Sequence, residues 1–308
     1  MGSMSRKEFL ADGAAFIAGT ACAAGEMLEA SSGPMDDGLH VKFFGTGAAE
    51  GMRYPKTTPN FRRQSSLLVE GRFLIDLTRM HDDMFAPGEE KPHVIVYTHS
   101  HGDHYDPVAA LRCGITDAYL SKTWIEDARK DFDRASKKLG LPMPTLHPLE
   151  LYKPFTLFGC YEIMPLPGNH WTGKPHEQAQ IYTIKKICRN GRVRLLYATD
   201  TSDIPSGAYF GGGFEQDPLT AVIMEATGQP GRKYDGLRIS HSNADSVVKI
   251  FSTYLKPGHA GYHPPKGQPV YFTHMGMDCW KNTDLESEIR DGFCAPSDGL
   301  EVTFKAVP

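Results

Sequence analysis

The sequence has no cysteine pair of the C-x-x-C kind and no excess of basic residues. Its six cysteines lie far apart in the chain, so neither a zinc ribbon nor a small disulfide-stapled fold is indicated. The formal net charge of −4 at pH 7 gives no basic surface, and we therefore expect no bulk binding to nucleic acid. A small-molecule substrate is expected instead. With 308 residues, of which 40% are hydrophobic, the chain can bury a large core.

Membrane-spanning runs and nucleotide-binding motifs are also missing. Beyond the N-terminal region no segment is long and apolar enough to cross a bilayer, so no transmembrane segment is predicted. The glycine-rich loop Gly45–Gly51 is not followed by Lys-Ser/Thr and contains no G-x-G-x-x-G pattern, which argues against a nucleotide site. Its glycines indicate a close approach of the backbone to another group. No internal repeat or low-complexity tract interrupts residues 41–304.

Residues 1–38 are predicted to lie outside the folded domain, which we expect over residues 39–308. Met1-Gly2-Ser3 before a second methionine is typical of a cloning scar. The next segment combines Arg6-Lys7 with an Ala/Gly-rich stretch, Gly13–Ala24, and resembles a twin-arginine export signal with lysine in place of the second arginine. If that signal is used, the protein is exported or periplasmic. The alternative is an amphipathic or disordered arm on a cytoplasmic protein.

A predicted strand followed by a histidine-rich turn is the most informative stretch. The apolar run Val94–Tyr97 reads as a buried strand. The turn after it carries ligand-type side chains in the pattern His-x-His-x-Asp-His, which are His99, His101, Asp103 and His104. Imidazole and carboxylate groups bind Zn²⁺, Mn²⁺ and iron, and a short turn after a rigid strand can aim several of them at one point. The alternative is a polar loop that is rich in histidine by chance.

Hydrophobic patterning predicts further strands and two helices. Strands are expected near residues 41–44, 65–69, 72–76, 155–158, 161–166, 181–187, 193–198, 221–225, 270–273 and 299–304. An apolar stripe at helical spacing predicts a helix up to residue 139, which begins with a capping box from Thr123 to Glu126. A second helix is expected after Ser242.

Ligand-type side chains recur where the predicted strands end. They are His99, His170, Asp200 and His274. Strand ends on one edge of a sheet gather in space, so we expect these side chains to meet. Asp76 ends the strand expected beside Val94–Tyr97, and we expect it to orient a ligand or to form a turn.

These residues together resemble the metallo-β-lactamase superfamily, over almost the whole chain from Val41 to Phe304. The resemblance implies an α/β fold, an αββα sandwich, with a site for two divalent metal ions between its sheets, Zn or Mn in the first place and Fe as a further candidate. It assigns His99, His101 and His170 to the first metal. It assigns Asp103, His104 and His274 to the second, with Asp200 bridging both.

Within the superfamily the sequence is most similar to the phosphodiesterase that opens cyclic phosphoribose phosphates in the carbon-phosphorus lyase pathway. The matching stretches are Gly45–Gly51, Pro165–His170, Thr199–Pro205, Thr273–Met275 and Asp298–Glu301. The resemblance makes His241 a candidate proton donor. The family's cysteine cluster for an additional zinc ion is missing, and Arg53–Pro59 stands in its place.

Other residues have both a functional and a structural interpretation. Asp103 is a candidate catalytic group that binds a metal and holds the proton of the nucleophile, whereas His241 also fits a simple helix cap. Trp171 is a substrate wall or part of the core. Basic residues that either bind a substrate phosphate or are solvated surface charges are Arg53, Arg62, Arg63 and Lys174.

We carry three functional hypotheses. The first is a dinuclear hydrolase that attacks a small phosphodiester or cyclic phosphate with a metal-activated hydroxide. The second keeps the site and changes the substrate to a lactone, another ester or an RNA 3′ end. The third is a non-hydrolytic metal protein, either an exported metal-binding module or an oxygen-reducing di-iron domain. The sequence leaves open a homodimer and the role of the loop at residues 256–265.

Overall fold

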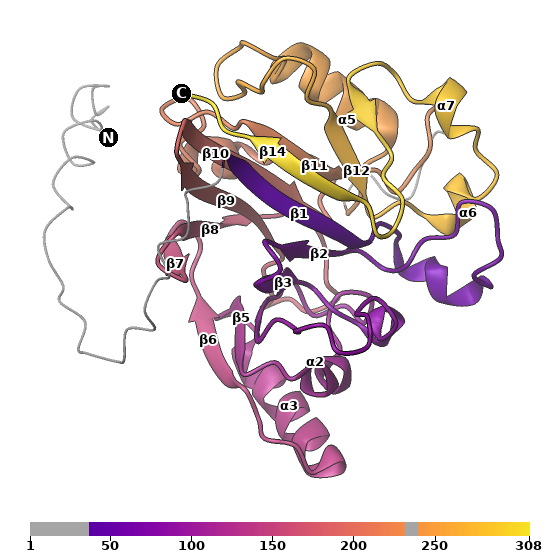
Figure 1. Ribbon diagram of the computed structural model, residues 1–308, viewed down its shortest axis with the longest axis vertical. Coiled ribbons are helices and arrows are strands. Elements are labelled where there is room, and N and C mark those ends of the chain that lie inside the picture. The colour runs from indigo at the N-terminus through magenta and orange to yellow at the C-terminus, as the bar shows by residue number, and fades with distance from the viewer. Residues whose placement is uncertain (1–36, 232–239) are drawn as a thin grey trace, which may run out of the picture. The chain divides into compact units, whose positions relative to one another are not determined.

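The computed structural model describes residues 37–231 and 240–308, whose strands form two sheets with helices on their outer faces (Figure 1). This α/β arrangement confirms the αββα sandwich predicted from the sequence. The predicted cloning scar and export signal lie outside the described residues, so the division at residue 38 stays a prediction. Within the described ranges, none of the helices is both long and apolar enough to cross a membrane.

The sheets have mixed strand directions. The first sheet contains, in spatial order, β14 (Glu301–Lys305), β1 (Gly38–Gly45), β2 (Ser66–Val69), β3 (Phe73–Ile75), β4 (Val94–Val96), β5 (Asp117–Ser121) and β6 (Thr145–Leu149). The second contains β13 (Phe293–Cys294), β12 (Val270–Thr273), β11 (Ala221–Glu225), β10 (Gly191–Ala198), β9 (Gln180–Cys188), β8 (Tyr161–Pro167) and β7 (Phe155–Leu157). Strands β3 to β6 are parallel, as are β10 to β13, so their carboxyl ends lie on common edges.

The helical segments are short, apart from α3. They are η1 (Ala49–Arg53), η2 (Arg79–His81), α2 (Pro107–Cys113), α3 (Ile125–Leu139), α4 (Ser206–Gly211), α5 (Ala244–Lys249), the π-helical turn η3 (Ile250–Tyr254), α6 (Met277–Trp280) and α7 (Leu285–Glu288). Figure 1 shows α2 and α3 on the side of β5 and β6, and α5 on the side of β11.

Three apolar clusters hold the layers together. The central cluster lies between the sheets and includes Val41 and Phe73 from the first sheet and Ile184 and Leu195 from the second. One outer cluster joins α2 and α3 to the first sheet, and the other joins α4, α5 and α6 to the second. Since each fully buried side chain of this size contributes about 1.5–3 kcal/mol, these clusters account for the rigidity of the strand ends.

Tight turns form where the sequence places glycine after a polar residue. Glu70, Gly71 and Arg72 connect β2 to β3, and the turn closes where the Arg72 N–H donates to the Val69 carbonyl at 2.9 Å. The φ values at Glu70 and Gly71 are 53° and 67°. Gly191, at φ 135°, lies at the predicted turn between β9 and β10. Both predicted hairpins are confirmed.

The predicted capping box of α3 is wrong. Trp124 is the N-cap residue and makes no side-chain cap bond. The Thr123 hydroxyl instead accepts the N–H of Gln178, 3.1 Å away, and lies 2.9 Å from Ser121 Oγ. The local pattern assigned the Thr123 hydroxyl to the N-terminus of the helix. This hydroxyl binds the backbone of a distant loop instead.

The glycine-rich loop lies close to a neighbouring backbone segment. A Cβ on Gly45 would lie 1.8 Å from the carbonyl oxygen of Gln64, and one on Gly47 would lie 2.9 Å from that of Arg63. Glycine is required at both positions because backbone fills the space. The loop also contacts the segment that follows β12 of the second sheet, because the Met275 N–H donates to the Thr46 carbonyl.

Buried His81 also contacts the backbone of this neighbouring segment, at Gln64. Its Nε2 donates to the Gln64 carbonyl at 2.8 Å, and its Nδ1 accepts the Thr78 N–H at 3.1 Å. Nδ1 also lies 3.1 Å from the Thr78 carbonyl oxygen, so the contacts alone do not fix its protonation, whereas burial disfavours the charged imidazolium. Burial lowers the pKa of His81 to about 4.

We predict that His81 makes the protein sensitive to acid. The neutral imidazole stabilises the fold above its ordinary pKa of 6.5, and this contribution is lost between pH 6.5 and about 4, because the unfolded chain binds a proton that the folded chain excludes. The loss amounts to about 3 kcal/mol. Urea unfolding of the chelator-treated protein across this range should give a flatter pH profile for His81→Gln than for the wild type. Exposed His259→Gln serves as the control, and equal slopes for His81→Gln and the wild type would contradict the prediction.

Candidate metal centre

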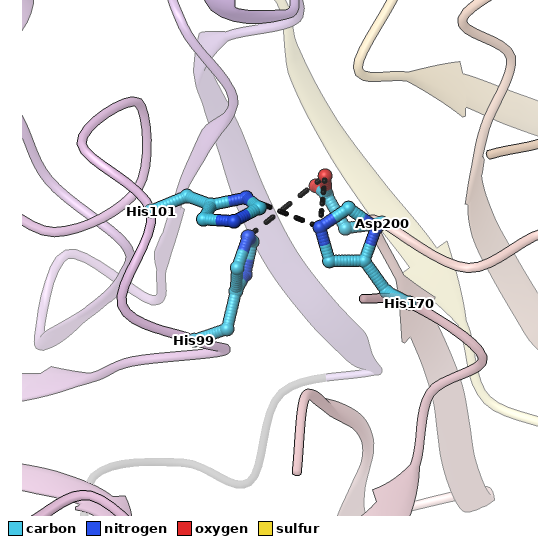
Figure 2. A group of neighbouring side chains, drawn as sticks. All are labelled: His99, His101, His170 and Asp200. Atoms are coloured by element: carbon cyan, nitrogen blue, oxygen red, sulfur yellow. Dashed lines mark hydrogen bonds and ion pairs between the residues drawn. The ribbon is translucent and has the colours of Figure 1, made fainter. Parts of the chain in front are cut away.

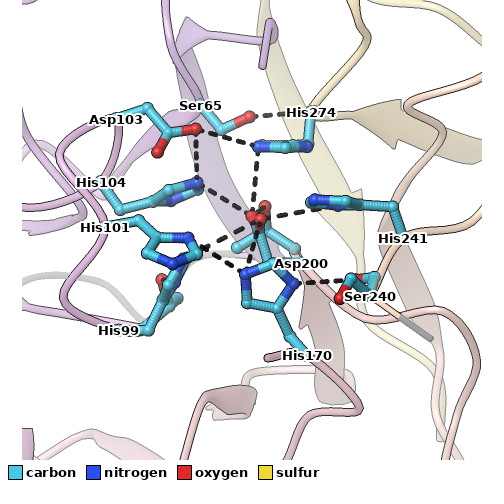
Figure 3. Close-up of polar contacts among 12 residues, drawn as sticks. Ser65, His99, His101, Asp103, His104, His170, Asp200, Ser240, His241 and His274 are labelled. Carbon is cyan, nitrogen blue, oxygen red and sulfur yellow. Dashed lines mark hydrogen bonds and ion pairs between the residues drawn. The ribbon is translucent and has the colours of Figure 1, made fainter. Parts of the chain in front are cut away.

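The structure gathers all the ligand-type side chains predicted from the sequence at one edge of the sandwich (Figure 3). The first group of them follows β4 of the first sheet. The others follow strands of the second sheet, with His170 after β8, Asp200 after β10 and His274 after β12. Because the sheets face each other, loops from both contribute to a single site.

One set of donors surrounds one oxygen of Asp200 (Figure 2). Oδ1 lies 3.9 Å from His99 Nε2 and 3.7 Å from His170 Nε2. His101 completes the set, since its Nδ1 lies 3.1 Å from His170 Nε2. The donor atoms of the four residues lie within 4.8 Å of one another, which makes them a candidate cation cluster.

A second set surrounds the other oxygen of Asp200. Oδ2 lies 2.9 Å from His104 Nε2 and 3.3 Å from His274 Nε2. Asp103 faces the same two imidazoles, since its Oδ2 lies 3.5 Å from His104 Nε2 and 3.3 Å from His274 Nε2. The two oxygens of Asp200 therefore point to different clusters.

The backbone at the strand ends adopts a conformation that few residues other than glycine accept. Asp76, Asp200 and His274 have φ values of 58°, 50° and 49°. Such left-handed conformations cost free energy and persist only where the surroundings fix them. At His274 the fixing contact is Ser65, whose Oγ accepts the His274 N–H at 2.9 Å. The turn redirects the chain as the strand ends.

Asp76 fixes the orientation of the His104 imidazole through its Nδ1. Its Oδ2 lies 2.7 Å from His104 Nδ1, while Thr98 donates its N–H to Oδ1 at 2.8 Å and its hydroxyl to Oδ2 at 2.7 Å. Because Asp76 binds Nδ1 of His104, Nε2 is the ring nitrogen that faces the site. Asp76 thus has the orienting position expected from the sequence.

The protonation states of His99, His170 and Asp200 favour cation binding. Burial, together with neighbouring His104, lowers the pKa of His99 well below its usual value, and burial lowers that of His170. Burial alone would raise the pKa of Asp200, but the imidazoles of His274 and His104 hold it well below its usual range. Neutral imidazoles and an ionised carboxylate are the forms that bind metals. Burial alone would lower the pKa of His104, but the carboxylates of Asp200 and Asp103 raise it well above its usual value, so this imidazole must release a proton when it binds a cation.

A buried imidazole nitrogen without a hydrogen-bond partner also indicates a cation site. Among the residues that the structure describes, His99 Nε2 makes no hydrogen bond although it is shielded from solvent. Such an atom costs free energy unless something binds it. Imidazoles combined with carboxylates suit Zn²⁺, Mn²⁺ or iron, so the residues present fit one or two divalent cations.

His241 and Glu225 extend the site beyond the predicted ligands. Glu225 Oε2 lies 2.9 Å from His241 Nδ1, and Asp200 Oδ1 lies 3.6 Å from the same nitrogen. The His241 ring stacks on that of His274 with 5.1 Å between centroids. Burial alone would lower the pKa of His241, but the carboxylates of Glu225 and Asp200 raise it to about 9.

Sequence reasoning missed Glu225, although a signal was present. Glu225 ends the apolar strand β11 in the same manner as the predicted ligands end theirs, and it is fully buried. A carboxylate in such a position needs polar partners. Besides His241, the Ser242 N–H donates to Oε1 at 2.5 Å and Thr227 donates to Oε2 at 3.2 Å.

The predicted substrate contacts lie in different surroundings. Trp171 is 56% exposed beside His170, so its interpretation as core is wrong. Arg62 is 2% exposed, and its guanidinium donates to Thr46 Oγ1 and to the Pro296 carbonyl. This burial contradicts a substrate contact by Arg62.

Arg63 is paired with carboxylates. Its guanidinium lies 2.9 Å from Asp83 and 3.6 Å from Asp298. Two acidic partners compensate its charge, and the predicted substrate contact of Arg63 stays a prediction.

Comparisons with known proteins agree with this fold. The model of the beta-lactamase superfamily domain matches residues 72–263. The chain is similar in structure to Zn²⁺-bound PqqB from Methylobacterium extorquens, with a TM-score of 0.56, 13% identity, and coverage of 85% of this chain and 99% of that one. It is similar to unliganded yeast PDE1 with a TM-score of 0.51, 11% identity, and coverage of 83% and 91%. None of the curated proteins matches in sequence. These identities show the fold alone.

We predict that Asp76→Asn weakens metal binding about 10–100-fold, because His104 loses the charged acceptor that fixes its ring. Asparagine tolerates the left-handed backbone at this position, so the fold should persist. Competition with a chromophoric zinc chelator measures the affinity. Asp82→Asn, which changes an exposed carboxylate nearby, should bind as the wild type does, and unchanged affinity in a folded Asp76→Asn variant would refute the orienting role.

Proposed function

Because the chain belongs to the beta-lactamase superfamily, we propose that it is a dinuclear metal-dependent hydrolase acting on a small phosphodiester or cyclic phosphate. We assign the hydrolase domain to residues 39–308. The observation that carries the proposal is the division of the Asp200 carboxylate between two donor clusters. A bridging carboxylate of this kind favours two cations over one.

The proposed metal ligands form two sets that share Asp200. One set is His99, His101 and His170, and the other is Asp103, His104 and His274. When bound, the cations would supply an activated water and neutralise the negative charge that develops on the phosphoryl oxygens. Zn²⁺ is the first cation to test, because PqqB, which has a similar fold, is a Zn²⁺-bound protein.

Asp103 has a second proposed task. Its Oδ2 already faces two imidazoles, and the side chain is 11% exposed at the site. A carboxylate so placed accepts the proton of the attacking nucleophile and keeps the nucleophile aligned.

His241 is the proposed proton donor for the leaving group. Glu225 occupies Nδ1, so the proton that His241 transfers is the one on Nε2. The buried carboxylate of Glu225 stabilises the imidazolium form and fixes the ring orientation, as a positioning residue does. A phosphodiester needs such a donor most when its leaving alkoxide is a strong base.

We predict that the protein binds two equivalents of Zn²⁺ or Mn²⁺ and that single ligand variants separate the two clusters. His170→Ala should lose one equivalent and His274→Ala the other, while Asp200→Ala weakens both. Turnover of bis(p-nitrophenyl) phosphate should fall at least about 100-fold in each variant. Metal analysis after dialysis provides the stoichiometry, with exposed His259→Ala as the control.

Two outcomes would overturn this assignment. A purified protein that stays metal-free in excess Zn²⁺ and Mn²⁺ would exclude the metal site. A metal-loaded protein that hydrolyses lactones but no phosphodiester would exclude the substrate class and leave the site intact.

We predict that His241→Gln lowers kcat about 10²–10⁴-fold for a phosphodiester with an alkyl leaving group. The loss should be much smaller for a p-nitrophenyl diester, because p-nitrophenolate leaves without protonation. Glu225→Gln should show the same dependence on the leaving group, with a smaller loss. Exposed His263→Gln is the control, and equal losses for both substrates would exclude proton donation.

A further inference from the structure

The loop at residues 168–179, between β8 and β9, carries His170 and is fastened at both ends. At its start, the Asn169 N–H donates to Thr201 Oγ1 at 2.9 Å and its side-chain amide donates to Ser202 Oγ at 2.6 Å. These contacts join the loop to the segment after Asp200. At its end the loop reaches the first sheet, where Gln180 donates its N–H to the Thr98 carbonyl at 3.0 Å.

Glu177 makes the strongest contact between this loop and the histidine turn. One carboxylate oxygen accepts the Ser100 N–H at 2.7 Å, and the other accepts the Ser100 hydroxyl at 2.6 Å. Ser100 stands between His99 and His101, both of which belong to the first donor cluster. A two-point contact to one residue fixes its backbone as well as its side chain.

The surroundings of Glu177 make this contact rigid. Its side chain is fully buried, and a buried carboxylate is tolerated only with good polar partners. Lys174 supplies the compensating charge, since its Nζ lies 3.7 Å from Glu177 Oε2 and donates to Ser100 Oγ at 2.9 Å. Ser100 Oγ thus donates to one partner and accepts from the other, which leaves it one orientation.

We propose that Glu177 is a positioning residue for the first metal cluster, because it sets the separation between the His99–His101 pair and His170. The inference rests on the metal-binding function proposed above. Figures 2 and 3 show His99 and His101 on one side of the site and His170 on the other. The loop bearing His170 and the turn bearing the other two histidines belong to different sheets, so they keep their spacing only through contacts such as the bridge from Glu177 to Ser100.

The test compares Zn²⁺ affinity and stoichiometry in Glu177→Ala, Glu177→Gln and the wild type, by chelator competition. Glu177→Ala should weaken one of two equivalents about 10–100-fold and leave the other unchanged. Glu177→Gln keeps an acceptor for the Ser100 N–H and should recover at least part of the affinity. Asp127→Ala is the matched control, because Asp127 also pairs with Lys174 but makes no contact with Ser100.

A role in stability alone would give a different pattern. The melting temperature of the metal-free variants and the absorption spectrum of the Co²⁺-loaded variants are measured in parallel. An altered Co²⁺ spectrum with selective loss of one equivalent supports the proposal. A lowered melting temperature with unchanged affinity and spectrum overturns it. If the wild type itself binds no metal, the proposed function fails, whereas wild-type binding with unchanged Glu177→Ala affinity rejects this inference alone.

Discussion

The site depends on the crowding of many donor atoms around one carboxylate. Asp200 is fully buried and faces imidazoles on both of its oxygens, with His99 and His170 on one and His104 and His274 on the other. Such a concentration of nitrogen and oxygen donors is costly in a protein interior unless cations or protons are shared among them. The rest of the fold holds the ligands where this sharing is possible.

Buried carboxylates behind the ligands hold this arrangement. Asp76 fastens His104, Glu225 fastens His241, and Glu177 fastens Ser100 between two predicted ligands. Each of them lies on a different strand end or loop, and each uses its charge for short contacts with neighbouring polar groups. Asp76 contacts a predicted ligand directly, and an outer carboxylate of that kind fixes the ring orientation and raises the basicity of the ligand. The rigidity of the site therefore extends well beyond the atoms that would touch a cation.

Three of the basic residues that were predicted as substrate contacts have partners within the protein. Arg62 is buried and Arg63 is paired with two carboxylates, while Lys174 lies within reach of Glu177 and Ser100. Trp171, beside His170, is exposed.

The sequence by itself determined most of the strands, both hairpins and the ligand-type residues at the strand ends, because apolar periodicity and strand-end histidines are local signals. It did not predict strands β5, β6 and β13. Only the tertiary structure decided the roles of Glu225, Glu177 and Arg62, since each role depends on a partner far away in the chain. The same reason explains the wrong capping box, where the Thr123 hydroxyl takes a partner in another loop. A local sequence pattern identifies polar groups that need a hydrogen-bond partner. The packing of the two sheets determines which partner each group has.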